Sequence, residues 1–256
     1  MSTGRDTVGK LAGRVAVVTG GGTGLGREIV EAFAGAGAAV VIASRKLEAC
    51  ERAAAEVHER HGVEALALSC NVGVWSECEA LVESVHDKFG QADVLVNNAG
   101  AAPMYRDMTD LTERMWRKVL DVNLLGAVAL SQGFGLRMAE VGRGSIINIT
   151  STGAVRPKDP FVPYAVAKAG LNTLTEAFAQ SLGPRGVRVN AIQCGPFATQ
   201  MASAWDDKVV NVLERTAALR RIGQPHEIQA AALYLASDEA AFMTGAILQL
   251  DGGATF

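Results

Sequence analysis

The stretch TGGGTGLG, residues 19–26, decides the fold of this chain. It follows the apolar run RVAVVT (14–19) and leads into the helix-forming segment GREIVEAFAGAG (26–37). Glycine lets the backbone turn sharply and approach a ligand without a Cβ in the way. The helix that follows offers unpaired N–H groups and a partial positive charge at its N-terminus, where a pyrophosphate can bind. A strand, a glycine-rich turn and a helix in this order predict a dinucleotide-binding unit.

The same alternation of strand and helix continues along the chain. Continuous apolar runs recur at 14–19, 39–44, 64–69, 93–97, 145–150, 187–192 and 246–250. Helical patterns lie between them, including 26–37, 46–61, 77–89 and a long one at 113–139. Continuous rather than alternating apolar runs are typical of parallel strands covered on both faces. We therefore predict an α/β, doubly wound fold of one domain, 1–256, with a seven-stranded parallel sheet, helices on both faces and an N-terminal extension at 1–13.

Composition excludes several classes of function. The net charge of −3, without a basic stripe, argues against nucleic-acid binding. No run reaches the roughly 18 apolar residues of a membrane span, so we expect a cytoplasmic protein. The four cysteines lack CxxC spacing, and HxxH at 58–61 has no further ligands at helpful spacing. We expect reduced thiols and no metal.

A second set of motifs follows the later strands. NNAG at 97–100 follows the fourth strand, Ser151 ends the fifth, and DGG at 251–253 closes the seventh. The glycines of the first loop have the spacing GxxxGxG, and YxxxK begins 13 positions after Ser151. This order over residues 14–253 resembles the short-chain dehydrogenases/reductases, a family of Rossmann-fold enzymes, and is most similar to their 3-oxoacyl carrier-protein reductases. The residues expected to be catalytic are Asn123, Ser151, Tyr164 and Lys168.

The catalytic chemistry follows from three of these side chains. A free tyrosine has a pKa near 10 and is a poor proton shuttle at neutral pH. Lys168 lies one helical turn after Tyr164, where its ammonium is expected to lower that pKa, and Ser151 can hydrogen-bond the substrate oxygen. The resemblance implies that Lys168 also holds the nicotinamide ribose and that Asn123 anchors a water that relays protons to it. Each residue taken alone could instead be an ordinary helix or turn residue, and only the set points to catalysis.

The ending of the second strand, AVVIASRK (39–46), bears on the choice of cofactor. NAD-selective proteins usually place an acidic residue here, against the ribose hydroxyls. This chain has Ser44, Arg45 and Lys46, which can bind a 2′-phosphate, so we expect NADP(H) to be preferred over NAD(H), although a solvated turn would look similar. The expected cofactor-binding residues are Gly20, Gly22, Thr23, Gly24, Leu25, Gly26, Ser44, Arg45, Lys46, Asn71, Val72, Asn98, Ala99, Gly100, Tyr164, Lys168, Gly195, Pro196, Phe197 and Thr199.

Two positions depart from the family pattern. Cys194 stands where the loop after the sixth strand usually has proline, and we expect a packed rather than a reactive thiol because no base is near in sequence. Asn71 stands where many members have aspartate against the adenine, and an amide can still bond the adenine edge.

The substrate is expected to meet an amphipathic lid at 197–222. Its lining would suit an acyl, alicyclic or aryl ketone better than a sugar, but the same side chains could simply pack the lid to the body. The expected substrate residues are Ser151, Val155, Phe161, Tyr164, Phe197, Met201 and Trp205.

Taken together, the sequence predicts an NADP(H)-dependent oxidoreductase acting on a small carbonyl or alcohol, most closely a ketoreductase. The alternatives are a sugar or polyol dehydrogenase of the same family and a catalytically silent dinucleotide sensor.

The helix from Tyr164 carries an apolar stripe that indicates core, and its other faces are rich in small residues. The resemblance implies that this helix and the preceding long one form the interface of a homotetramer, or a homodimer, although packing within one chain would look the same.

Overall fold

The computed structural model describes residues 9–200, 202 and 205–255 and contains one seven-stranded sheet. The strand order is β3-β2-β1-β4-β5-β6-β7, with every neighbouring pair parallel. Each predicted strand is present, and no end is displaced by more than two residues. The strands are β1 Val15–Thr19, β2 Ala39–Ser44, β3 Ala65–Ser69, β4 Val94–Asn97, β5 Gly144–Ser151, β6 Val187–Cys194 and β7 Ile247–Leu250.

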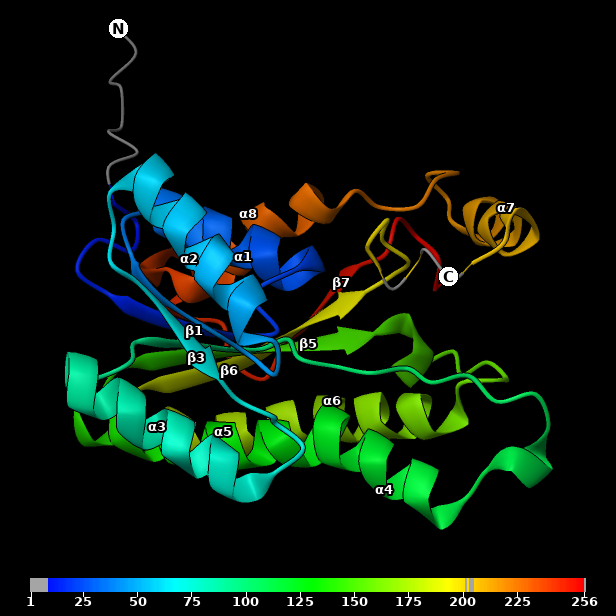
Figure 1. Ribbon diagram of the computed structural model, residues 1–256, viewed down its shortest axis with the longest axis horizontal. Coiled ribbons are helices and arrows are strands. Elements are labelled where there is room, and N and C mark those ends of the chain that lie inside the picture. The colour runs from blue at the N-terminus through cyan, green and yellow to red at the C-terminus, as the bar shows by residue number, and fades with distance from the viewer. Residues whose placement is uncertain (1–8, 201, 203–204, 256) are drawn as a thin grey trace, which may run out of the picture.

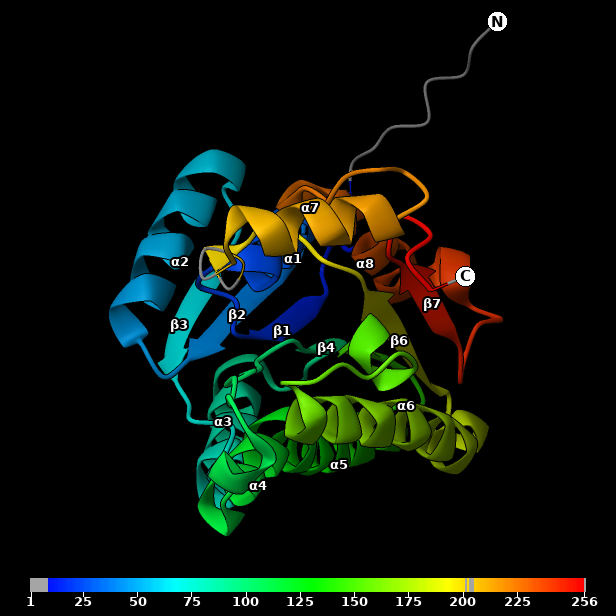
Figure 2. The same ribbon diagram turned by 90° about the vertical axis from the view of Figure 1, so that its right-hand side faces the viewer.

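Helices cover both faces of this sheet (Figures 1 and 2). One face is covered by α1, α2 and α8, and the other by α3, α5 and α6. Phe33 of α1 and Leu130 of α5 are buried in separate apolar clusters on the two sides, as the doubly wound prediction requires. The helices are α1 Gly24–Gly35, α2 Leu47–His61, α3 Trp75–Phe89, α4 Glu113–Leu120, α5 Gly126–Glu140, α6 Val162–Leu182, α7 Asp207–Thr216 and α8 Gln229–Ala236.

The long helix predicted at 113–139 contains a change of hydrogen bonding. Between α4 and α5 the backbone forms a π turn, η2, at Asp121–Leu125. A π turn is a local widening of a helix and is frequent at functional sites.

By length and apolar composition alone, the helical segment Glu113–Glu140 could cross a membrane, which the sequence prediction did not anticipate. Half of its most apolar window is, however, buried inside the protein.

The predicted lid includes the helix α7, which Figure 1 shows beyond the carboxyl ends of the strands. The Asp206 side chain caps it by accepting a hydrogen bond from the Val209 N–H at 2.8 Å. Leu219 in turn donates its N–H to the Gly252 carbonyl at 3.0 Å, which ties the end of the lid to the C-terminal segment. Met201 lies outside the described residues.

Residues 9–13 of the predicted N-terminal extension pack against the body of the fold. Leu11 is fully buried and donates its N–H to the Ala36 carbonyl after α1 at 3.0 Å. An apolar side chain with these contacts belongs to the body of the fold, so residues 9–13 are part of the domain. Residues 1–8 lie outside the described part of the chain.

Candidate active site

The glycine loop between β1 and α1 is held open for a ligand by backbone conformation. Gly20 has a φ of 65°, in the left-handed region that glycine tolerates. A Cβ on Gly26 would collide with the Gly20 carbonyl oxygen, so the tight turn into α1 requires glycine there. Asn98, after β4, donates its side-chain amide to the Thr19 carbonyl at 2.9 Å and fixes the loop to the neighbouring strand.

Ser151 and Tyr164 meet at the carboxyl end of β5. Ser151 ends that strand, and Tyr164 lies in the first turn of α6 with its phenol hydrogen-bonded to the Ser151 hydroxyl. Burial raises the pKa of Tyr164 to about 12, while the Ser151 hydrogen bond acts in the opposite direction. Without a ligand, Tyr164 therefore holds its proton across the neutral range.

Lys168 does not lower the pKa of Tyr164 as the sequence predicted. Its Nζ lies 5.7 Å from the centre of the Tyr164 ring and donates to the Ile149 carbonyl at 2.8 Å. Burial lowers the pKa of Lys168 itself to about 8, because a buried ammonium loses its hydration. Helical spacing brings the two residues together, but the tertiary surroundings determine their protonation.

Asn123 lies in the π turn, and its side chain is bonded to the backbone. Its amide donates to the carbonyls of Ala101 at 2.8 Å and Val119 at 2.9 Å, and its Oδ1 accepts from the Ala101 N–H at 3.1 Å. A Cβ on Gly100 would lie 3.0 Å from Asn123 Oδ1 and 3.8 Å from Lys168 Nζ, so the two side chains flank the NNAG loop. Asn123 fastens the loop after β4 to the helix, which makes its side chain a positioning group.

A cavity of about 650 Å³ joins the glycine loop to Tyr164. Thr199 faces the start of α1, since a Cβ on Gly24 would lie 3.6 Å from the Thr199 Cβ. A pyrophosphate beside this helix N-terminus and a nicotinamide toward Lys168 fit the shape and the donors of the cavity. The predicted residues that line it are Gly20, Thr23, Gly24, Leu25, Asn98, Ala99, Gly100, Ser151, Phe161, Tyr164, Lys168, Gly195, Pro196, Phe197, Thr199 and Trp205.

Other predicted residues do not line this cavity. Gly22 packs against Ala49 of α2, and Gly26 and Val72 are buried, Val72 in the apolar cluster with α3 and α5. Val155, predicted to contact substrate, is 50% exposed and lies outside the lining. These residues share loops with true lining residues, and sequence position alone does not reveal which way a side chain points.

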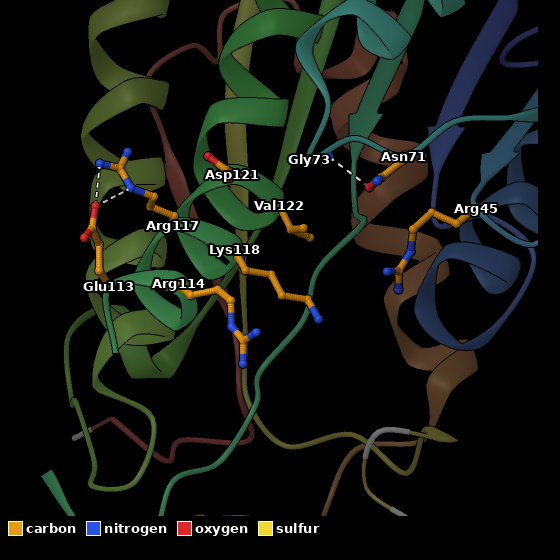
Figure 3. Close-up of a pocket in the computed structure, with 9 residues that line it drawn as sticks. All are labelled: Arg45, Asn71, Gly73, Glu113, Arg114, Arg117, Lys118, Asp121 and Val122. Carbon is orange, nitrogen blue, oxygen red and sulfur yellow. Dashed lines mark hydrogen bonds and ion pairs between the residues drawn. The ribbon is translucent and has the colours of Figure 1, made fainter. Parts of the chain in front are cut away.

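A second cavity, of about 470 Å³, lies where the adenosine half of the cofactor is expected (Figure 3). Arg45 and Asn71 contribute to its lining. Ser44 and Lys46 do not line it. The Ser44 hydroxyl contacts Cys50 Sγ at 3.1 Å and accepts from the Lys46 N–H at 3.2 Å, so it secures the start of α2. Of the three residues Ser44, Arg45 and Lys46, only Arg45 faces this cavity.

Cys194 is a packed thiol at the nicotinamide end. Burial raises its pKa to about 12, so the nucleophilic thiolate is scarce at neutral pH. A Cβ on the next residue, Gly195, would lie 2.7 Å from the Asp251 Cα. Position 195 therefore requires glycine, although Cys194 before it departs from the family pattern.

The sequence analysis did not anticipate part of the cavity lining. These residues come from the loop after β4, the loop before α6, the lid and the C-terminal segment. No local motif marks them, because they reach the cavity only through the folding of distant segments. They include Met104, Arg156, Lys158, Leu213, Thr216 and Thr255. In the residues that the structure describes, no cluster of three metal-ligating side chains occurs.

Comparisons with known proteins agree with this geometry. The family described as enoyl-(acyl carrier protein) reductase matches residues 20–255. The short chain dehydrogenase/reductase astE of Aspergillus oryzae is 36% identical over 98% of both chains. D-threitol dehydrogenase of Mycolicibacterium smegmatis is also 36% identical, over 96% of this chain and 94% of that one. The crystal structure of the NADPH-dependent 3-quinuclidinone reductase of Rhodotorula rubra superposes with a TM-score of 0.91 at 32% identity, covering 95% of this chain and 92% of the other.

The fold, the site and these relatives define an oxidoreductase that acts on alcohol or ketone groups with a nicotinamide cofactor. Within that class, the chain belongs to the short-chain dehydrogenase/reductase family.

Proposed function

We propose that the protein is an NADP(H)-dependent ketoreductase that interconverts an apolar ketone and a secondary alcohol. One observation carries this proposal. Ser151 and Tyr164 are hydrogen-bonded to each other at a cavity that also contains the glycine loop at the start of α1. A substrate oxygen beside these two hydroxyl groups lies in the same cavity as the cofactor.

Tyr164 and Ser151 have different roles in the proposed reaction. The bound nicotinamide supplies or accepts the hydride. Tyr164 donates its phenolic proton to the carbonyl oxygen in reduction, while Ser151 holds that oxygen in place with a hydrogen bond. Because burial keeps the pKa of Tyr164 at about 12, the proton needed for reduction is present at neutral pH, whereas the phenolate needed for oxidation is scarce.

The cavity lining supports an apolar ketone. Phe161, Phe197 and Trp205 contribute aromatic surface, and Met104 and Leu213 extend it. A polyol dehydrogenase is the second candidate, because a relative that is 36% identical is named D-threitol dehydrogenase. A polyol would need several hydrogen-bonding partners, for which Thr216 and Thr255 are available in the same cavity.

Arg45 supports the preference for NADP(H). It lines the cavity where the adenosine end is expected, and the end of β2 has Ser44 in place of the acidic residue that would repel a 2′-phosphate. The structural relative from Rhodotorula rubra is named an NADPH-dependent reductase.

The proposal is tested by turnover of a panel of apolar ketones and of polyols with NADPH and with NADH. The Tyr164→Phe variant is expected to lose about 10³-fold in kcat for its best substrate, because general acid catalysis typically contributes about 10²–10⁴-fold. NADPH binding, followed by nicotinamide fluorescence, is expected to change far less than kcat in the same variant.

Other outcomes would decide against parts of this proposal. Turnover confined to polyols would favour the second candidate. A wild type that binds NADPH but reduces and oxidises nothing in the panel, with Tyr164→Phe indistinguishable from it, would instead favour a dinucleotide sensor.

A further inference from the structure

The cavity at the predicted adenosine end has a second cationic wall. Arg45, directly after β2, lines one side, and Asn71 and Gly73, after β3, also contribute to the lining. Arg114 and Lys118 of α4 line the other side (Figure 3). These last two are four residues apart, so they share one face of the helix. In Figure 3 the side chains of Arg45 and Lys118 extend toward the same open space.

These cations are available to a ligand. Within the described part of the chain, no hydrogen bond or ion pair involves the side chains of Arg45, Arg114 or Lys118. Arg117 of the same helix also borders the cavity, but it forms an ion pair with Glu113 at 2.7 Å and points away from Arg45 in Figure 3. Asp121 also lines the cavity, but among the described residues no ion pair joins it to Arg45, Arg114 or Lys118. These three cations repel one another across the cavity, and an anion between them would relieve that repulsion.

The position of the cavity identifies the anion. Arg45 and Asn71 contribute to it, and these are the residues expected to meet the adenosine half of the cofactor. Its volume of about 470 Å³ lies within the range of small-molecule sites. NADP(H) differs from NAD(H) only by the 2′-phosphate on that half, so a cationic cluster here selects for the phosphate.

We propose that Arg114 and Lys118 of α4 bind the 2′-phosphate of NADP(H) from the side opposite Arg45. This inference rests on the proposed preference for NADP(H) and adds a determinant of that preference outside the β2–α2 turn.

The test compares the affinities of the full-length protein for NADPH and NADH, measured by fluorescence titration at low and at moderate salt. Arg45→Ala, Arg114→Ala, Lys118→Ala and the double variant Arg114→Ala/Lys118→Ala are compared with Arg117→Ala. Arg117→Ala is the matched control. It removes one positive charge from the same helix, but at a residue whose side chain is ion-paired with Glu113. Circular dichroism checks that each variant is folded.

The double variant is expected to lose about tenfold in NADPH affinity and less than about twofold in NADH affinity, because charge-assisted bonds to phosphate are lost. Its NADPH affinity is also expected to fall less with added salt than that of the wild type. Arg117→Ala is expected to leave both affinities unchanged.

The outcomes separate this inference from the proposed function. If Arg45→Ala loses NADPH selectivity while the double variant keeps it, the role of α4 is overturned and the cofactor preference stands. Equal losses for both cofactors in the double variant would also overturn the role of α4. A wild type without preference for NADPH would overturn the cofactor preference and this inference together.

Discussion

At the scale of single residues, the site depends on buried groups whose charge the fold suppresses. Lys168 is buried and donates to the Ile149 carbonyl, and Tyr164 is partly buried beside Ser151. Burial favours the neutral forms of the Tyr164 phenol and the Lys168 amine. It therefore opposes the formation of a Tyr164 phenolate and a Lys168 ammonium before the cofactor binds. Burying such groups is expected to lower the stability of the fold, because burial penalises their charged forms. We attribute their presence to catalysis rather than to folding.

We expect Lys168→Met to stabilise the fold at neutral pH while abolishing activity. The pKa of Lys168 falls from 10.5 to about 8 on folding, so below pH 8 the folded state bears the cost of a buried ammonium. That cost is roughly 3 kcal/mol, at 1.36 kcal/mol per pKa unit. Because the unfolded chain keeps its proton up to about pH 10.5, the wild type should regain this stability between pH 8 and 10.5.

Urea unfolding at pH 7 and pH 10.5 measures the difference, with Lys88→Met as control because Lys88 is an exposed residue paired with Glu64. The advantage of Lys168→Met over wild type should be largest at pH 7 and vanish at the higher pH. A variant no more stable than the wild type at pH 7 would show that the ammonium is well solvated or paired in the folded protein.

At the scale of elements, two junctions position the site. The turn from β1 into α1 brings Gly26 against the Gly20 carbonyl, and the π turn between α4 and α5 brings Asn123 to the backbone of Ala101. The first junction could be predicted because glycine spacing encodes it directly. The second could not, because nothing in DVNLL distinguishes a π turn from an ordinary turn of helix.

We expect Gly26→Ala to weaken dinucleotide binding and to destabilise the fold by roughly 1–3 kcal/mol, the usual cost of overpacking. The added methyl group meets the Gly20 carbonyl and the Asn98 amide, which are fixed by their own hydrogen bonds. Gly183→Ala is the control, because no atom lies within 4 Å of a Cβ at that position. Thermal unfolding and NADPH titration of both variants measure the effects, and a Gly26→Ala protein that matches the control in both would contradict the steric argument.

At the scale of the whole molecule, α5 and α6 lie side by side on one face of the sheet (Figure 2). Each exposes a large apolar side chain, Leu136 of α5 at 44% and Val166 of α6 at 48%. Gly170 lies against Leu124 and Gly135 against Leu182, so Val166 and Leu136 lie at opposite ends of this helix pair. Exposed apolar side chains spread along two adjacent helices are consistent with a subunit interface that covers both helices. This is the surface through which we propose that the chain forms a homodimer or homotetramer.

Light scattering coupled to size exclusion tests this assembly. The wild type is expected to elute as a dimer or tetramer, and Leu136→Lys with Val166→Lys to elute as a monomer, because two buried charges would face each other across a symmetric interface. Met108→Lys is the control, since Met108 is also exposed but lies on a short helix outside this pair. A monomeric wild type would exclude the proposal.

The sequence by itself determined the doubly wound fold and the glycine loop, and the spacing that resembles the family pattern singled out Ser151, Tyr164 and Lys168 as candidates. These features depend on local spacing, which places residues on one strand end or one helix turn whatever the rest of the chain does. Only the tertiary structure decided that Ser44 and Val155 face away from the cavities, that Met104 and Thr255 join the lining, and that Lys168 leaves the pKa of Tyr164 high. These outcomes depend on burial and on contacts between distant segments, which create the local dielectric and direct each side chain, and no pattern along the chain records them.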